Sequence, residues 1–101
     1  MNAEKAASEA VDPDRLLDGE DPTSTFADDA VHWKRVYQEL LDYKIELLAT
    51  TRQRVEEMER RAAEEVEKTD LRVIGAEAAR LRRRLDFWER RADELGATTP
   101  N

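Results

Sequence analysis

Residues 71–95 read LRVIGAEAARLRRRLDFWERRADEL, and the spacing of their apolar residues is the clearest pattern in the chain. The gaps between these residues alternate between three and four. The residues are Leu71, Ile74, Ala78, Leu81, Leu85, Trp88, Ala92 and Leu95. Because an α-helix has about 3.6 residues per turn, this spacing places them along one stripe. Charged residues flank the stripe as in a coiled-coil seam, and Gly96 follows as a stop signal. We therefore expect a helix over residues 70–95 that pairs with another helix.

A second helical pattern precedes this one. No Gly or Pro occurs between Thr25 and Arg61, and Ser24 or Thr25 is a suitable N-cap. Apolar residues again recur at gaps of three and four. They include Ala30, Trp33, Tyr37, Leu40, Leu47, Val55, Met58 and Ala62. This pattern predicts a helix over residues 25–64.

The connection between the two helices is the main choice in the fold. The window 64–70 holds a single apolar residue, and the stripe of the first helix cannot be carried through it in phase to Leu71. Thr69 or Asp70 can cap a new helix. A single continuous helix is the alternative, but it could bury its stripe only against another chain. We expect an all-α, antiparallel two-helix hairpin, coiled-coil-like, with its turn at about residues 65–70.

A turn at this place fixes which residues face each other. It puts Leu95 beside Leu40 and Trp88 beside Leu47, so that apolar residues meet along the seam. The first residues of the first helix would then extend beyond the end of the second and would need another partner. These are Phe26, Ala30, Trp33 and Val36.

Residues 1–24 differ in composition from the hairpin that spans residues 25–96. They carry seven acids against two bases, two of the three prolines and few apolar residues. Such a composition is typical of a disordered acidic tail. Residues 14–17 could form one helical docking turn, and the segment could wrap over the hairpin instead. We expect residues 97–101 to be a flexible C-terminus.

The first helix is apolar over an arc wider than one partner helix can cover. We assign these residues as a candidate partner-binding face. They are Trp33, Val36, Tyr37, Leu40, Leu41, Lys44 and Leu48. A second copy of the chain, the N-terminal segment or a different protein could cover the rest of the arc. We expect a homodimer that forms a four-helix bundle, in which the ammonium of Lys44 pairs with an acid or reaches past the helix edge.

Two charged clusters stand out. The basic cluster consists of Arg80, Arg83, Arg84, Arg90 and Arg91. Acids are interleaved with it, which favours a solvated face with ion pairs across the seam. The candidate acidic tip consists of Glu64, Glu65, Glu67 and Asp70. It resembles, in architecture alone, the acid-tipped helical hairpins of factors that enter the secondary channel of RNA polymerase. The alternative function is a regulator of nucleic-acid machinery that acts through the acidic tip or the basic cluster.

Catalytic and membrane signals are weak. The chain has no Cys, its only histidine is His32, and it contains neither a Gly-rich phosphate loop nor a Glu-x-x-His pair. A net charge of −7 disfavours binding to nucleic acid. No apolar run approaches the roughly 20 residues that span a bilayer, and no signal peptide is visible. We expect a cytoplasmic, non-enzymatic protein–protein interaction or structural adaptor module, without metal or cofactor, that recognises a protein partner.

Overall fold

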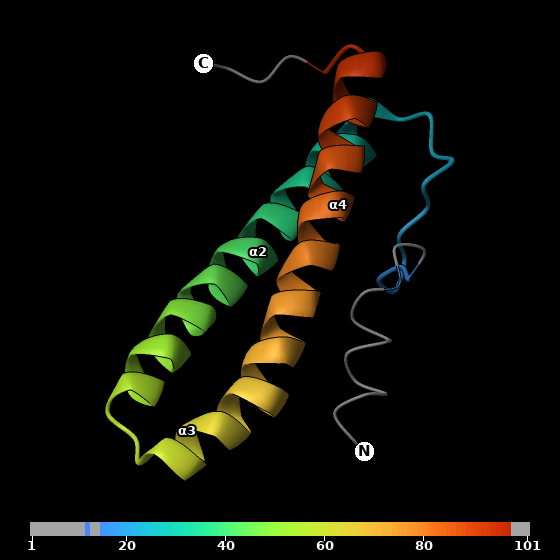
Figure 1. Ribbon diagram of the computed structural model, residues 1–101. Coiled ribbons are helices and arrows are strands. Elements are labelled where there is room, and N and C mark those ends of the chain that lie inside the picture. The colour runs from blue at the N-terminus through green and yellow to red at the C-terminus, as the bar shows by residue number, and fades with distance from the viewer. Residues whose placement is uncertain (1–11, 13–14, 98–101) are drawn as a thin grey trace.

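The computed structural model describes residue 12 and residues 15–97, and the regular structure in this part of the chain is entirely helical. The elements are α2 (Ala27–Glu56), α3 (Arg60–Val66), the π-helix η1 (Glu67–Leu71) and α4 (Arg72–Glu94). α2 and α4 lie side by side and antiparallel, with α3 at the end of the molecule where the chain reverses (Figure 1). The predicted all-α helical hairpin is confirmed.

The predicted position of the turn is wrong, because residues 65–70 are helical. Val66, Glu67 and Arg72 all have right-handed helical backbone angles, so α3, η1 and α4 form one continuous helix. η1 is a π turn, which accommodates one more residue than an α-helical turn. Within it, the Thr69 hydroxyl donates a hydrogen bond to the carbonyl of Glu65 at 2.8 Å. The break in the spacing of apolar residues, which predicts a turn here, is therefore accommodated by the π turn within a continuous helix.

The chain reverses at residues 57–59 instead. The amides of Glu57 and Met58 donate hydrogen bonds to the carbonyls of Arg54 and Val55, each at 3.1 Å. Glu59 then takes an extended conformation, with φ −55° and ψ 141°, and α3 begins. Every residue type adopts such angles readily, so the turn needs neither Gly nor Pro and carries no sequence signal.

The earlier turn changes the register between the helices. Lys44 forms an ion pair with Glu77, and Leu47 lines the same groove as Ile74. The predicted pairing of Leu47 with Trp88 is therefore wrong. Because α4 extends further along α2 than predicted, it also covers the start of α2, and Ala30 is fully buried.

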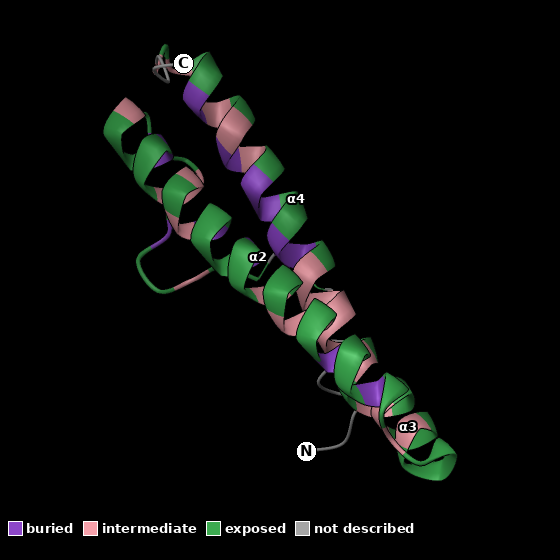
Figure 2. Cartoon of the chain, turned by 90° about the vertical axis from the view of Figure 1, so that its left-hand side faces the viewer, coloured by how far each residue is buried: buried purple, intermediate pink, exposed green. Residues whose placement is uncertain are grey.

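The apolar core lies at the end of the hairpin opposite the turn. It contains Ala30, Tyr37, Leu41, Leu81, Leu85, Trp88 and Ala92. Burial of each large side chain in this set contributes roughly 1.5–3 kcal/mol. Nearer the turn, the buried residues of α2 are Thr51 and Val55, and α3 and η1 contribute none (Figure 2). The half of the hairpin opposite the turn, which we call the proximal half, is thus well packed. The half near the turn, which we call the distal half, is only loosely covered.

The segment before α2 runs alongside α4 and enters α2 near the end of α4 (Figure 1). Leu17 packs against the core, and Glu20 and Ser24 are buried. A disordered tail is therefore not confirmed for residues 15–24, which follow the wrap considered as an alternative. The docking turn expected at residues 14–17 is not helical over 15–17. The expectations for residues 1–11, 13–14 and 98–101 lie outside the described residues.

None of the helices in the described part of the chain is both long enough and apolar enough to cross a membrane.

Candidate functional site

Residues 15–24, which we call the strap, carry the most elaborate polar contacts of the structure. Two consecutive turns shape the strap. In the first, the amide of Glu20 donates a hydrogen bond to the carbonyl of Leu17 at 3.0 Å, and the amide of Leu17 donates one back to Glu20 Oε1 at 3.0 Å. Gly19 has φ +83°, a left-handed conformation that glycine adopts without a Cβ clash. This turn points the Glu20 carboxylate between the two helices.

The second turn spans Asp21 to Ser24. The amide of Ser24 donates to the carbonyl of Asp21 at 3.2 Å, and Pro22 supplies the fixed φ that the second position of a turn favours. The amide and hydroxyl of Thr23 donate to Asp21 Oδ1 at 2.9 and 2.6 Å. These two hydrogen bonds lower the pKa of the Asp21 carboxyl below its usual value.

The predicted N-cap of α2 is wrong, because the helix begins two residues later. Phe26 occupies the N-cap position without a side-chain cap. The Ser24 hydroxyl instead donates to Asp29 Oδ2 at 2.6 Å and accepts the amide of Phe26 at 3.2 Å. Ser24 thereby joins the end of the strap to the first turn of α2.

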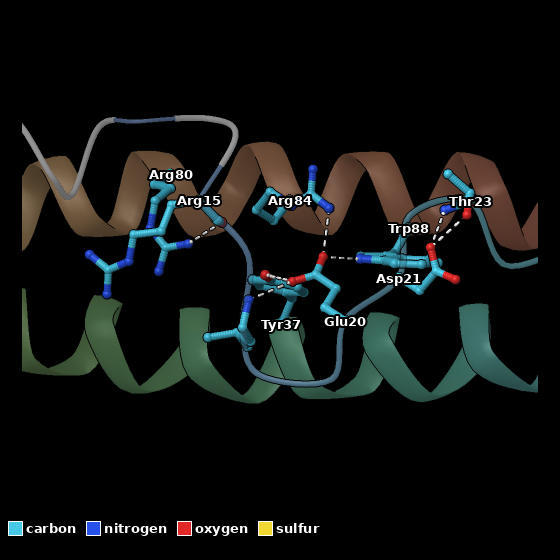
Figure 3. A network of polar contacts seen from close by, with 9 residues as sticks. Arg15, Glu20, Asp21, Thr23, Tyr37, Arg80, Arg84 and Trp88 are labelled. Atoms are coloured by element: carbon cyan, nitrogen blue, oxygen red, sulfur yellow. Dashed lines mark hydrogen bonds and ion pairs between the residues drawn. The ribbon is translucent and has the colours of Figure 1, made fainter.

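The Glu20 carboxylate is the centre of the site, and only 8% of this residue is exposed. Oε1 accepts hydrogen bonds from the Tyr37 hydroxyl and from the amide of Leu17. Oε2 accepts them from Arg84 Nη2 at 2.5 Å and from the indole N–H of Trp88 at 2.7 Å. Figure 3 shows these groups converging from the strap, α2 and α4. A buried charge is tolerated here because it is both paired and fully hydrogen-bonded.

The pKa values in this site follow from the same contacts. Burial raises the pKa of Glu20, but the hydrogen bonds from Tyr37, Leu17, Arg84 and Trp88 outweigh it, and the net pKa lies below 4.5. Burial, together with the adjacent Glu20 carboxylate, raises the pKa of Tyr37 to about 12. Both shifts keep Glu20 ionised and Tyr37 protonated over a wide pH range.

Three arginines of α4 hold the strap along its length. Arg80 Nη1 donates to the carbonyl of Arg15 at 3.2 Å, and Arg91 Nη2 donates to the carbonyl of Ser24 at 3.0 Å. Arg84 binds Glu20 between them, and its guanidinium lies 4.6 Å from the centre of the Phe87 ring. Spacings of four and seven residues bring the three arginines to one side of the helix.

The predicted basic cluster is thus divided. Arg80, Arg84 and Arg91 face the strap, whereas Arg83 and Arg90 are exposed. The expected ion pairs across the seam to α2 are not formed by Arg84 or Arg91 in the described residues. Arg84 pairs with Glu20 of the strap, and Arg91 pairs with Glu94 at 3.2 Å.

The predicted partner-binding face is divided as well. Tyr37 and Leu41 belong to the buried core. The other residues of the face, Trp33, Val36, Leu40, Lys44 and Leu48, are partly covered or exposed. The ammonium of Lys44 pairs with Glu77 of α4, which agrees with the expectation of an acidic partner.

The residues predicted as an acidic tip lie on the side of a helix. Glu64 and Glu65 belong to α3, and Glu67 and Asp70 belong to η1. All four are exposed, and Glu64 forms an ion pair with Arg60 at 3.4 Å. The end of the hairpin consists of residues 57–59.

A groove of about 350 Å³, which we call the distal groove, opens between α2 and the long helix near the turn. Its lining residues are mainly apolar. They are Leu47, Thr51, Arg54, Met58, Val66, Asp70, Val73 and Ile74. The sequence does not predict this groove, because its existence depends on the π turn and on the register.

Sequence reasoning also missed Glu20, which it counted only as one of the acids of a tail. A usable signal exists in Gly19 and Pro22, which flank Glu20 and favour two successive turns. Turns of this kind orient a side chain, but they do not reveal which donors it meets.

Comparison of the chain with models of protein families, with curated proteins and with solved structures gives no match. Among the described residues, no group of three or more His, Asp or Glu side chains is placed to hold a metal ion.

Proposed function

We propose that the protein is a non-enzymatic protein–protein interaction module that works as a homodimer, with two hairpins packed through their distal grooves into a four-helix bundle. The observation that supports this proposal is the uneven burial of the hairpin. The proximal half has a closed core, whereas Leu47, Met58 and Val66 remain partly exposed around the distal groove. Covering these side chains is favourable by about 25 cal/mol for each Å² of apolar surface removed from water.

The charges of the distal groove favour a second copy as its occupant. The groove carries one cation, Arg54, and one anion, Asp70, and neither forms an ion pair within the described part of the chain. A two-fold axis exchanges the two surfaces, so Arg54 of one protomer can face Asp70 of the other twice. Tyr43, which is 60% exposed, lines a shallow pocket with Leu47 and extends the same surface.

Sedimentation velocity of the full chain at tens of micromolar tests the dimer. We expect wild type to sediment as a dimer and Leu47→Glu to sediment as a monomer with unchanged helical circular dichroism. Val31→Glu is the matched control, since Val31 is also partly exposed on α2 but lies outside the groove. A monomeric wild type would refute the proposal.

A charge exchange tests the occupant more specifically. Arg54→Asp and Asp70→Arg should each weaken the dimer, because like charges then face each other across the axis. The double variant should recover most of the wild-type dimer affinity. If it does not, the two residues do not pair across the interface.

The alternative function, regulation of nucleic-acid machinery, stays a prediction. Arg83 and Arg90 are the exposed members of the basic cluster, so a gel-shift assay with charge reversal at both positions is its direct test.

A further inference from the structure

We propose that the surface beneath the strap is a docking site for an acidic, non-helical segment of a partner protein, and that the strap is its intramolecular occupant. This site lies in the proximal half of the hairpin and is separate from the distal groove. It therefore stands independently of the homodimer.

The contacts to the strap are those that a site makes to a bound peptide with two turns. Arg84 and Trp88 of α4 donate hydrogen bonds to one carboxylate of the strap. Arg80 and Arg91 donate hydrogen bonds to two of its main-chain carbonyls. The hydroxyl of Tyr37 on α2 completes the carboxylate pocket. Apart from Glu20, the strap packs Leu17 against the core and buries Ser24, whereas Leu16 is 40% exposed and Asp18 and Thr23 are exposed. A segment that follows the same turned path, with a glutamate, an apolar residue in place of Leu17 and free flanking carbonyls, offers the same contacts.

The strap leaves part of this site unused. The Nε groups of Arg80, Arg84 and Arg91 are buried and have no hydrogen-bond partner among the described residues. Arg80 is only 5% exposed, and no described carboxylate forms an ion pair with it. Buried guanidinium N–H groups without acceptors are unfavourable. A segment with acids on both sides of the central glutamate would supply the missing acceptors, so the partner is more acidic than the strap at these positions.

The strap can be displaced without unfolding the hairpin. It contains no helix or strand, its own backbone hydrogen bonds are local, and its C-terminal end leads directly into α2. A short tether gives such a segment an effective concentration on the order of millimolar. A partner can bind only the molecules whose strap is released, so its apparent affinity is proportional to the fraction of such molecules. The bound strap therefore raises the partner concentration that is needed for binding.

The test measures binding of a fluorescein-labelled peptide with the sequence of residues 15–24, by anisotropy, to three full-length chains. Wild type is compared with Glu20→Gln, which removes the carboxylate of the strap and leaves every donor of the site in place. The third chain, Gly19→Val, loosens the first turn through its positive φ and keeps all the site residues. It keeps the test informative if Glu20→Gln does not fold.

We expect the peptide to bind both variants at least ten-fold more tightly than wild type. A control peptide with Gln in place of the glutamate should bind at least ten-fold more weakly than the parent peptide. A peptide with additional Glu residues beside Arg80 and Arg91 should bind more tightly than the parent. Absence of binding to a variant with wild-type helicity, or equal binding of the Glu and Gln peptides, would overturn the proposal.

Discussion

At the scale of single residues, Glu20 controls the placement of the strap. Its carboxylate satisfies donors from three parts of the chain, and no other carboxylate of the described region forms an ion pair with Arg84. Removing one member of a buried ion pair leaves the other charge uncompensated. The strap is peripheral, so its release allows water to reach Arg84 and limits the loss of stability.

Glu20→Ala should lower the free energy of unfolding by about 2 kcal/mol, below the 3–5 kcal/mol of a fully enclosed pair. Urea unfolding followed by circular dichroism measures this change. Asp18→Ala is the control, because Asp18 is an exposed acid of the same strap, and it should change stability by less than about 0.5 kcal/mol. Equal stability of the two variants would show that the Glu20 contacts contribute little.

Lowering the pH should remove the stability that ionised Glu20 contributes to the folded state. The pKa of Glu20 in the folded protein lies below 4.5, its value in the unfolded chain, so folding favours the ionised form. The resulting stability is present above about pH 4.5 and is lost as the pH falls through the lower folded pKa. Urea midpoints measured from pH 6 to pH 3 should fall less steeply in Glu20→Gln than in wild type. If the urea midpoints of the two proteins fall in parallel with pH, protonation of Glu20 is not the cause of the acid-induced loss of stability.

Raising the pH should also lower the stability, in this case through ionisation of Tyr37. Its pKa of about 12 in the folded protein exceeds the usual value of 10.0, so folding favours the protonated phenol. The contribution is present below pH 10 and is lost as the pH rises towards 12. Tyr37→Phe should flatten the loss of stability over this range. Absorbance of the phenolate in wild type should show one tyrosine that titrates near pH 12.

At the scale of elements, the π turn η1 decides how α3 is oriented relative to α4. One additional residue in a helix rotates everything beyond it by about 100°. Val66 and Leu71, five residues apart, are both partly buried, whereas Glu67, Lys68 and Asp70 between them are exposed. The π turn therefore keeps the apolar residues before and after it on the same side of the long helix.

Deletion of Lys68 should convert η1 to regular α-helix and turn Val66 away from α2. We expect the helical content to remain and the free energy of unfolding to fall by about 1–2 kcal/mol, a typical cost of lost packing. Lys68→Ala, which keeps the chain length, should have almost no effect because Lys68 is exposed. A deletion variant as stable as wild type would mean that the alignment of α3 is unimportant for stability.

At the scale of the whole molecule, the two halves of the hairpin differ in packing. The extents of 52 × 30 × 16 Å describe an elongated molecule, and its core occupies the proximal half with the strap. The distal half combines exposed charged side chains with partly covered apolar ones. Regions with few buried contacts open locally at low free-energy cost.

Within the hairpin, hydrogen exchange should therefore be slowest around Leu41, Leu85 and Trp88, and fastest in residues 57–71. Mass spectrometry of peptide fragments measures this pattern. If the dimer forms through the distal groove, protection of residues 57–71 should rise with protein concentration, while the proximal half stays constant. Leu47→Glu should remove that concentration dependence.

The sequence alone determined that the chain forms two helical arms, and it identified most of the core. The stripe from Leu81 to Ala92 identifies residues that are buried in the structure, and the recurrence of apolar residues at gaps of three and four predicts the two helical arms. These features are predictable because helical periodicity depends only on the spacing of neighbouring residues.

Only the tertiary structure decided where the chain reverses, which residues face each other and what surrounds Glu20. The turn at residues 57–59 uses ordinary backbone angles, and a break in helical phase fits a π turn as well as a loop. The side-chain donors to Glu20 are 17, 64 and 68 residues away along the chain. A carboxylate on a polar segment has no local property that distinguishes it as buried, because its environment is created by residues that folding alone brings close.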